Sequence, residues 1–298
     1  MSEHQNNGKE KLHVKDILNP KRLPCDEFEK MRRSVVLPAL IRRQLTRYSR
    51  LIMTLQKTQC SDNPLNGLLI FSGPPGSGKT MTAQAIAQIM AKKHKKFFDS
   101  EIVFISLNPA ALFSELLGKT SRFIVEAFEM VKFSVQRQLT ILLIDEIESL
   151  AYSRVRISSS DPSDVVRASN ELLRQIDLFC GAPNFLLIGT TNLSSHLDSA
   201  LMDRADLVIP FQNPDVETGK VILVNAARHV QQFGISLLEE DLVSAAEDLC
   251  ARPCEERPSG RLLAKLPLLS YLEGSSRNLN AGELVRIASQ KIDRKEHL

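Results

Sequence analysis

The segment from Gly73 to Thr80 constrains the fold of this chain more than any other. It reads GPPGSGKT and matches the pattern G-x-x-x-x-G-K-[S/T]. An apolar run at Leu68–Ser72 predicts a strand directly before it, and a helical pattern predicts a helix from Lys79 to about Lys93 directly after it. A strand, a glycine-rich turn and a helix in this order predict a phosphate-binding loop.

The phosphate loop is expected to bind ATP together with magnesium. Glycines let the backbone approach phosphate oxygens and turn its N–H groups toward them. Lys79 would reach the β- and γ-phosphates, and the Thr80 hydroxyl would bind Mg²⁺. A chance glycine-rich turn is the alternative, and the strand–loop–helix context argues against it. The expected nucleotide-binding residues are Gly73, Pro74, Pro75, Gly76, Ser77, Gly78, Lys79 and Thr80.

A pair of acids follows a second apolar run. Ile141–Ile144 predicts a fully apolar strand, and Asp145 and Glu146 come directly after it. An ordinary strand end would also give this pattern, but the phosphate loop upstream favours a catalytic pair. We expect Asp145 to hold Mg²⁺, directly or through water, and Glu146 to orient and polarise the attacking water. Glu148 and Ser149 are expected only to begin the next segment.

Asn192 follows the next predicted strand, Phe185–Thr190, in the sequence TTN. A short neutral amide in this place would hydrogen-bond the γ-phosphate or the attacking water. Taken alone, an asparagine after a strand is more often part of a turn. Its position as the third motif in the series favours the functional interpretation.

Two arginines are candidates for contacts with nucleotide. Arg204 lies in the sequence DRAD at 203–206, and it would either reach a neighbouring subunit's nucleotide or belong to a surface ion network. Arg261 follows Ser259-Gly260 at the start of a predicted apolar helix. A positive charge there is unfavourable for the helix dipole, so a compensating anion is plausible, and a solvated arginine is the alternative. From the residues alone, both alternatives stay open for each arginine.

Strand and helix patterns alternate from the phosphate loop onward. The remaining expected strands are Ile102–Leu107 and Leu207–Pro210, and the remaining expected helices are Ser121–Gln136 and Asp164–Phe179. This alternation predicts the α/β class, as a P-loop module whose parallel sheet is covered by helices on both faces. Beyond Asn213-Pro214 the strand runs stop and the pattern is helical, which predicts a small C-terminal helical domain. The expected domains are residues 1–64, with a polar flexible tail over 1–20 and a basic linker helix; residues 65–212, which bind nucleotide; and residues 213–298, which are helical.

A basic run lies before the phosphate loop. From Lys30 to Lys57 the chain has eight Lys or Arg and no Asp or Glu, with apolar residues at helical spacing. This pattern predicts one amphipathic helix with an arginine-rich face. We favour packing of this helix on the core, with its arginines solvated or facing an acidic neighbouring subunit. Contact with DNA or substrate is the alternative, but no aromatic platform interleaves with the basic side chains. The net charge of +3 is also small for a nucleic-acid-binding protein.

The rest of the sequence indicates a cytoplasmic protein without a membrane partner. No stretch approaches the roughly 20 apolar residues that a membrane-spanning helix needs, and the first residues lack the apolar core of a secretory signal. The five cysteines are scattered and lack the spacing of zinc ligands. A reducing compartment suits them best.

The motifs, in their order along the chain, resemble those of the AAA+ superfamily. Within it, the chain resembles the pachytene-checkpoint remodellers, which act on HORMA-domain proteins. The segments that carry the resemblance are LLIDEIESL (142–150), DPSDVVRASNELLRQID (161–177), TTNLSSHLDSALMDRAD (190–206) and SGRLLAKLPLLSYL (259–272). The resemblance runs from about Leu65 to the C-terminus.

This resemblance implies a homo-hexameric ring with ATP at each subunit interface. It implies that Asn192 is sensor 1, Arg204 the arginine finger and Arg261 sensor 2. The ring would grip an extended segment of a HORMA-domain protein in its central pore, and ATP hydrolysis would unfold that protein locally or separate its complexes. With only 64 residues before the module, the chain is expected to be a compact bacterial member. Such members occur beside HORMA-domain proteins and nucleotide second-messenger synthases in anti-phage defence.

The pore residues depart from the family's pattern. The first pore loop of the family usually carries an aromatic residue before a glycine, whereas here Leu116 and Leu117 precede Gly118. These three are the expected pore residues. Leu116 can still grip a substrate by burial, worth about 1.5–3 kcal/mol, but without aromatic stacking. The segment Arg154–Ser160 fits a second pore loop and a surface loop equally well.

Two other functions compete with HORMA-protein remodelling. A DNA-linked AAA+ ATPase of the loader or replication type would place the basic helix on the phosphate backbone and show DNA-stimulated, salt-sensitive turnover. The small net charge and the resemblance argue against nucleic acid as a partner. A regulatory switch that binds nucleotide with little turnover is the third alternative. The presence of Glu146 argues against such a switch, because no member of the hydrolytic set is missing.

Overall fold

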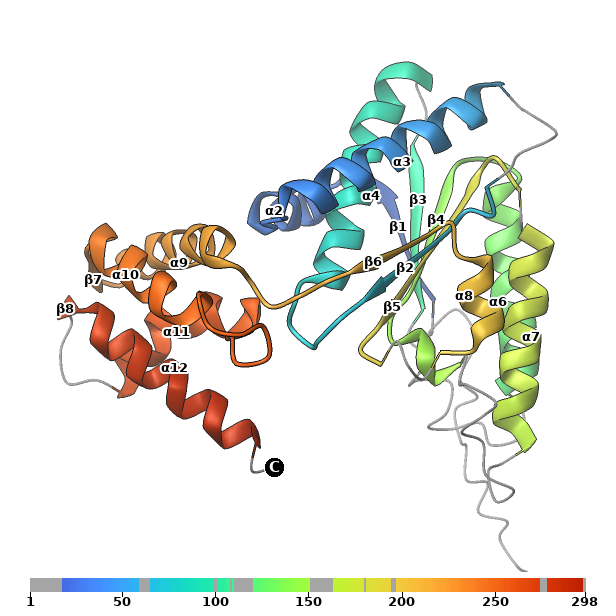
Figure 1. Ribbon diagram of the computed structural model, residues 1–298. Coiled ribbons are helices and arrows are strands. Elements are labelled where there is room, and N and C mark those ends of the chain that lie inside the picture. Colours follow the sequence, from blue (N-terminus) through green and yellow to red (C-terminus); the bar gives the residue numbers. More distant parts are fainter. Residues whose placement is uncertain are drawn as a thin grey trace, which may run out of the picture.

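The computed structural model describes residues 18–58, 65–98, 101–107, 109, 120–150, 163–179, 181–193, 197–273 and 278–296. Its larger part is a six-stranded sheet, parallel except at one edge, with helices on both faces (Figure 1). The strands are β1 (Leu18–Leu23), β2 (Leu68–Ser72), β3 (Ile102–Leu107), β4 (Thr140–Ile144), β5 (Phe185–Thr191) and β6 (Leu207–Pro210). The helices around the sheet are α2 (Asp26–Ser34), α3 (Ala39–Thr58), α4 (Lys79–Phe98), α6 (Thr120–Val135), α7 (Ser163–Phe179) and α8 (Ser199–Arg204), with the 3-10 turn η1 (Ile147–Ser149). The predicted α/β fold is confirmed.

The strand order of the sheet brings the three motifs together. The order is β1-β3-β4-β5-β2-β6, and all strands except β1 are parallel to one another. Strand β5 therefore lies between β2, which leads into the phosphate loop, and β4, which leads into the acid pair. Parallel strands end at the same edge of a sheet, and this is where α/β proteins bind their ligands.

Alternation along each strand divides the core into two layers. In β2, Leu68 and Ile70 pack with helices α6 and α7, whereas Leu69 and Phe71 pack with α3 and α4. Both sets are fully buried, which explains why the strand reads as a continuous apolar run rather than as alternating polar and apolar residues. A sheet of this kind is stable only with helices on both faces.

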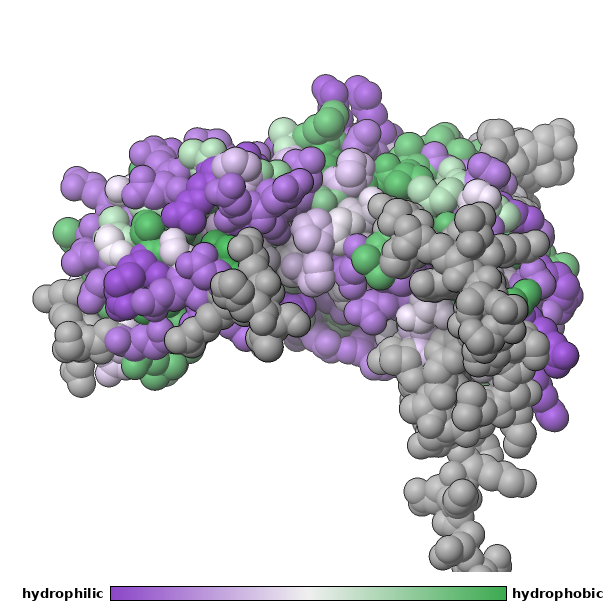
Figure 2. Space-filling model, turned by 60° about the horizontal axis from the view of Figure 1, so that its bottom comes forward, coloured by the Kyte–Doolittle hydropathy of each residue, from purple (hydrophilic) through white to green (hydrophobic). Residues whose placement is uncertain are grey.

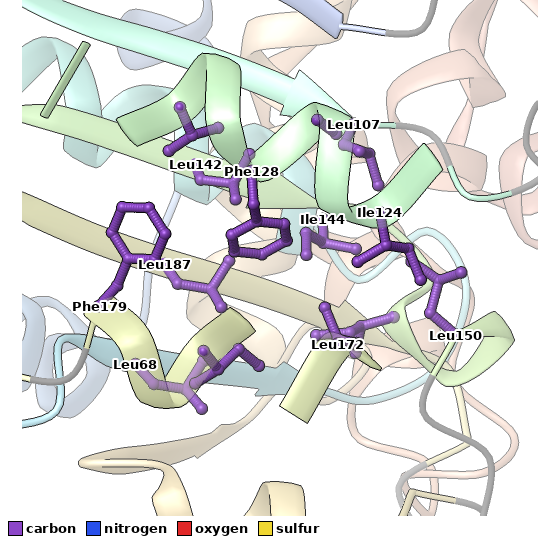
Figure 3. Packing of buried hydrophobic residues seen from close by; sticks show 14 of the residues in the cluster. Leu68, Leu107, Ile124, Phe128, Leu142, Ile144, Leu150, Leu172, Phe179 and Leu187 are labelled. Carbon is purple, nitrogen blue, oxygen red and sulfur yellow. The ribbon is translucent and has the colours of Figure 1, made fainter. Parts of the chain in front are cut away.

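Two aromatic rings lie among the aliphatic residues of the layer beneath α6 and α7 (Figure 3). Phe128 of α6 and Phe179 of α7 lie over Leu142 and Leu187 of the sheet. The two rings are 5.7 Å apart between centroids, a separation at which an aromatic pair adds about 0.5–1.5 kcal/mol beyond its buried area. This packing attaches α6 and α7 to β4 and β5, the strands that lead to the acid pair and to Asn192.

The N-terminal part differs from its prediction in two respects. Residues 18–20 were expected to be part of a flexible tail, but they begin β1, which pairs antiparallel with β3 and buries Leu18 and Leu23. The basic run was expected to form one helix, but it is divided between α2 and α3 by residues 35–38. Pro38 explains the break, because proline disfavours helical backbone at the residue before it and has no N–H to donate. Helix α3 packs its apolar stripe on the core, as favoured.

Asp206 joins the start of β2 to helix α3. Its carboxylate accepts hydrogen bonds from the backbone N–H groups of Asn66 (2.8 Å), Gly67 (2.8 Å) and Leu68 (3.2 Å) and from the Tyr48 hydroxyl (2.7 Å). Burial and this hydrogen bond raise the pKa of Tyr48 far above its usual value. Asp206 is therefore a structural residue of the DRAD sequence.

Replacing Asp206 with alanine is expected to lower the free energy of unfolding by about 2–4 kcal/mol, because several donors lose a charged acceptor. Urea denaturation followed by circular dichroism would measure this loss. Asp203 is exposed in the same sequence and provides the matched control, Asp203→Ala, which should change stability by about 0.5 kcal/mol or less. Equal effects of the two substitutions would contradict the structural role of Asp206.

The C-terminal part is helical and has a core of its own. It contains α9 (Val216–Gln231), α10 (Glu239–Cys250), α11 (Gly260–Glu273) and α12 (Ala281–Glu296). Sixteen buried residues form its cluster, all from Leu223 onward. The expectation that strands stop after Asn213 is wrong in one detail, because β7 (Ser236–Leu237) and β8 (Asn278–Leu279) pair in parallel. Two-residue strands leave too little apolar pattern to be seen in a sequence.

The surface is mostly hydrophilic. Hydrophilic residues predominate on the face drawn in Figure 2, and hydrophobic residues occur there in small groups. Exposed large hydrophobic side chains are distributed over several parts of the chain, among them Leu178 on α7, Phe233 after α9 and Leu272 on α11. Scattered apolar residues of this kind are normal on protein surfaces. Among the described residues, no helix combines the length and the apolar character that crossing a membrane requires.

Candidate functional site

The phosphate loop lies between the carboxyl end of β2 and the first turn of α4. Gly76 and Gly78 have φ angles of 80° and 96°, a region that residues with side chains rarely adopt. A Cβ atom at Gly76 would also lie 3.0 Å from Ser259 Oγ and 3.2 Å from Arg261 Cβ. Glycine at this position therefore satisfies the backbone turn and lets the helical part of the chain approach the loop.

Lys79 is buried beside the loop, with only 7% of its surface exposed. Its Nζ donates hydrogen bonds to Gly73 O (2.7 Å), Pro74 O (2.9 Å) and Asn192 Oδ1 (2.8 Å). Burial lowers the pKa of Lys79, and nearby carboxylates oppose this shift. The ammonium group thus lies between the loop and the end of β5, within reach of both.

Replacing Lys79 with alanine is expected to weaken ATP binding at least about 100-fold, because charge-assisted hydrogen bonds to phosphate are lost from a buried site. Titration of a fluorescent ATP analogue would measure the dissociation constant. Lys95 is exposed at the far end of the same helix, so Lys95→Ala is the matched control and should bind nucleotide as the unmodified chain does. Near-normal affinity in the Lys79 variant would contradict the assignment.

Thr80 and Asp145 form a set of oxygen ligands suited to magnesium. Thr80 Oγ1 donates to Asp145 Oδ1 (2.9 Å) and Oδ2 (3.1 Å), and Thr190 Oγ1 donates to Asp145 Oδ1 as well. In nucleotide sites Mg²⁺ is usually held by one or two protein oxygens together with phosphate oxygens. No group of three or more His, Cys, Asp or Glu within the described ranges could hold a metal ion. The residues present therefore fit Mg²⁺ that binds with the nucleotide.

Glu146 lies on the turn after β4 and contacts Asn192. Its φ angle is 53°, the left-handed conformation, which costs a non-glycine residue about 1–2 kcal/mol. The Glu146 N–H donates to Thr190 Oγ1 (3.1 Å), and Asn192 Nδ2 lies 3.4 Å from Glu146 Oε1. Asn192 thus bridges Lys79 and Glu146 with the two ends of one amide. A water and a γ-phosphate placed beside this amide would meet both a cation and a carboxylate.

Arg261 approaches the loop from the helical part of the chain. It lies in the first turn of α11, and its backbone N–H donates to Gly76 O (3.3 Å). Its side chain is exposed, and its charge is one of the smaller contributions to the lowered pKa of Lys79. The structure thus brings the SGR sequence to the phosphate loop, where a guanidinium could contact an anion.

Arg204 lies away from the other candidates. Its Nε and Nη2 donate to the two carboxylate oxygens of Asp177 (2.6 and 2.9 Å), and its Nη1 donates to Ala200 O (2.7 Å). Hydrogen bonding to the Arg204 guanidinium holds the pKa of Asp177 below its usual value. The Arg204 carbonyl accepts a hydrogen bond from Asn66 Nδ2 (2.9 Å). Asn66 lies just before the amino end of β2, whereas the phosphate loop follows its carboxyl end. Arg204 therefore takes part in a surface ion pair, which was one of the two alternatives left open for it by the sequence.

Two residues of this site, and the partner of Arg204 outside it, were not identified from the sequence. Glu148 was expected only to begin the next segment, but its Oε1 accepts from the Asn192 N–H (3.0 Å). The Thr190 hydroxyl donates to Asp145 Oδ1 and accepts from the Glu146 N–H. Asp177 pairs with Arg204. Only Thr190 gave a signal, as part of the TTN sequence. The expected pore residues Leu116, Leu117 and Gly118, and the segment Arg154–Ser160, lie outside the described residues.

The chain has relatives among known proteins. Residues 69–213 match the family described as ATPase family associated with various cellular activities (AAA). The chain is similar to CD-NTase-associated protein 6 of Pseudomonas aeruginosa, with 31% identity over 240 residues that cover 78% of this chain and 77% of that protein. It is also similar to the pachytene checkpoint protein 2 homolog of Oryza sativa subsp. indica, with 29% identity over 84% of this chain, and it spans 59% of that protein's length. A chain in the solved structure of the E. coli MS115-1 HORMA:CdnC:Trip13 complex has the same fold, with a TM-score of 0.74 and 19% identity over 94% of this chain and 97% of that one.

Proposed function

Because the chain belongs to the AAA ATPase family, with pachytene checkpoint protein 2 and CD-NTase-associated protein 6 as relatives, we propose that it is an ATP-driven protein remodeller. Its substrate is a HORMA-domain protein, which it partly unfolds or releases from a complex. It acts in anti-phage signalling. Hydrolysis depends on Mg²⁺ and is coupled to the change in the substrate protein.

One observation carries the hydrolytic part of this proposal. The Asn192 amide contacts Lys79 on one side and Glu146 on the other, directly beside the Thr80–Asp145 pair. The groups that we assign to hydrolysis in this way all lie near the carboxyl ends of β2, β4 and β5, which supports the proposal. A protein that only binds nucleotide would not need a carboxylate at the position of Glu146.

Each residue has a distinct task in the proposed reaction. Lys79 binds the β- and γ-phosphates, and Asn192 hydrogen-bonds the γ-phosphate or the attacking water. Thr80 and Asp145 would hold Mg²⁺, which would neutralise charge on the phosphate oxygens. Glu146 orients the water and accepts its proton as the oxygen attacks the γ-phosphorus, and the bond from that phosphorus to the bridging oxygen breaks, so that ADP leaves.

The remaining assignments concern assembly. We assign the ring six copies of the chain, with ATP at each interface, Arg204 as the arginine finger of the neighbouring site and Arg261 as sensor 2. The position of Arg204 at the far edge of the sheet supports action on a neighbour, because its own phosphate loop is at the opposite edge. The separate helical cluster supports the division into residues 65–212 and 213–298, with residues 1–64 preceding them.

Two relatives support the choice of substrate. One relative is by name associated with a CD-NTase, and the fold is shared with a chain of a complex that contains a HORMA protein. The pore assignment of Leu116, Leu117 and Gly118 belongs to the same proposal. The exposed arginines of α3 favour one competing partner, nucleic acid, so the experiment must detect both.

The test is affinity capture from lysate of the source cells with the Glu146→Gln chain loaded with ATP, followed by mass spectrometry and a nucleic-acid stain. We expect a HORMA-domain protein with ATP and none with ADP. Hydrogen exchange of that protein, with the unmodified chain and ATP, should then reveal newly exposed backbone. Nucleic acid recovered without a HORMA-domain protein would instead assign the chain to the DNA-linked class. A captured HORMA-domain protein whose exchange does not change would contradict remodelling.

A further inference from the structure

Glu148 is a buried carboxylate that the proposed hydrolytic set does not use. It is only 8% exposed and lies on the turn η1, two residues after Glu146. Its Oε1 accepts the Asn192 N–H at 3.0 Å, whereas its Oε2 is buried without a hydrogen-bond partner in the described part of the chain. Burying a carboxylate is unfavourable by several kcal/mol unless its interactions compensate, so an acid at this position calls for a role.

The turn that carries Glu148 is fitted closely to β5. A Cβ atom at Gly189 of β5 would lie 2.9 Å from Ile147 Cδ1 and 3.3 Å from Ile147 Cγ2. Because Gly189 has no side chain, Ile147 of η1 can pack directly against β5. The left-handed backbone of Glu146 reverses the chain just before this contact. Together these features bring the Glu148 carboxylate to the end of β5.

Asn192 directly follows the end of β5, so contacts outside the strand must fix its position. Strand β5 ends at Thr191, so Asn192 has no ladder partner and its backbone depends on other contacts. Its N–H is held by Glu148, while its side-chain amide reaches Lys79 at 2.8 Å and Glu146 at 3.4 Å. A shift of the backbone would move this amide relative to both groups, and errors of about 1 Å in a catalytic group can slow a reaction about 100-fold.

We propose that Glu148 is a positioning residue for Asn192: its carboxylate oxygen fixes the Asn192 backbone, so that the side-chain amide stays between Lys79 and Glu146. This inference rests on the proposed ATP hydrolysis at the site. Glu148 itself does not touch the nucleotide or the water. It acts as a hydrogen-bond acceptor, through Asn192.

The test uses two substitutions of similar size. Glu148→Gln keeps a carbonyl oxygen that can accept the Asn192 N–H, whereas Glu148→Met fills the same space without an acceptor. We expect Glu148→Met to lower kcat for ATP about 10- to 100-fold, and Glu148→Gln to stay within about threefold of the unmodified chain. Ser149→Ala, on the same turn, is the control and should stay within about twofold.

Both substitutions are then repeated in an Asn192→Ala background. If Glu148 acts through Asn192, Glu148→Met will cause no further loss of kcat there, because the two changes remove one interaction. A full additional loss in that background would overturn the proposal, and so would equal losses in the Gln and Met variants. Thermal melting of each variant identifies any loss that comes from unfolding.

Nucleotide affinity separates this inference from the proposed function. The preference for a non-hydrolysable ATP analogue over ADP is measured for every variant, since ADP lacks the γ-phosphate beside which the Asn192 amide would act. We expect Glu148→Met and Asn192→Ala to reduce this preference by the same factor, and the double variant by no more. An unmodified chain without ATP turnover would contradict the proposed function, while this ratio would still decide the role of Glu148.

Discussion

Replacing Glu146 with glutamine is expected to leave ATP bound and to slow its hydrolysis about a thousandfold. Glutamine has the size of glutamate and keeps an oxygen that can accept from Asn192 Nδ2, now 3.4 Å from Glu146 Oε1. It cannot accept a proton from the attacking water as a carboxylate does. Glu146 is exposed, so the substitution removes no core packing. Phosphate release and equilibrium ATP binding, measured side by side, would separate the two effects.

A matched control is available for this substitution. Glu129 is an exposed acid on α6, so Glu129→Gln changes the net charge by the same amount without touching the site. We expect its turnover to equal that of the unmodified chain. If the Glu146 variant turned over ATP at a rate within a few-fold of normal, another group would have to activate the water, and the assignment of Glu146 would be wrong.

The elements that lie deepest in the fold were predictable from sequence. Strands β2 and β3 begin and end where the apolar runs predicted, because strands buried on both faces read as uninterrupted apolar segments. Strand β6 also has its predicted bounds, although it lies at the edge of the sheet and is largely exposed. Strand β1 was missed, since LNPKRL has no such pattern and its strand conformation comes from pairing with β3. Here the tertiary partner decides the local structure, and one sequence does not reveal that partner.

The site was predictable to the extent that each residue stands in a motif. Lys79, Thr80, Asp145 and Asn192 lie together as the series of motifs indicated. Glu148 was missed because an acid after a strand gives the same pattern whether it is exposed or buried, and its burial depends on the turn at η1. The family resemblance, read from four segments, is confirmed by the matches to the AAA family and to CD-NTase-associated protein 6.

The second large effect is expected for Arg204→Ala, which should lower kcat about a thousandfold while ATP binding is retained. Asn66, which binds the Arg204 carbonyl, lies seven residues before Gly73 along an extended strand. At about 3.3 Å per residue, this places Arg204 roughly 20 Å from the start of its own phosphate loop. If Arg204 neutralises charge in the transition state, as we propose, this distance requires that it do so at a neighbour's site. The same assays of phosphate release and ATP binding apply.

Mixed rings distinguish this action from a structural role. Arg204→Ala subunits keep Glu146, and Glu146→Gln subunits keep Arg204, so random mixing in equal amounts would restore both groups at about a quarter of the interfaces. Activity should rise well above that of either variant alone.

Asp177→Asn is the second control, because it breaks the same ion pair and leaves Arg204 in place. An exposed pair of this kind contributes about 0–1 kcal/mol, so this variant should fold and retain most of its turnover. If Asp177→Asn were as slow as Arg204→Ala, and mixing restored nothing, Arg204 would serve its own subunit through Asp177, and the site would be complete without a neighbour.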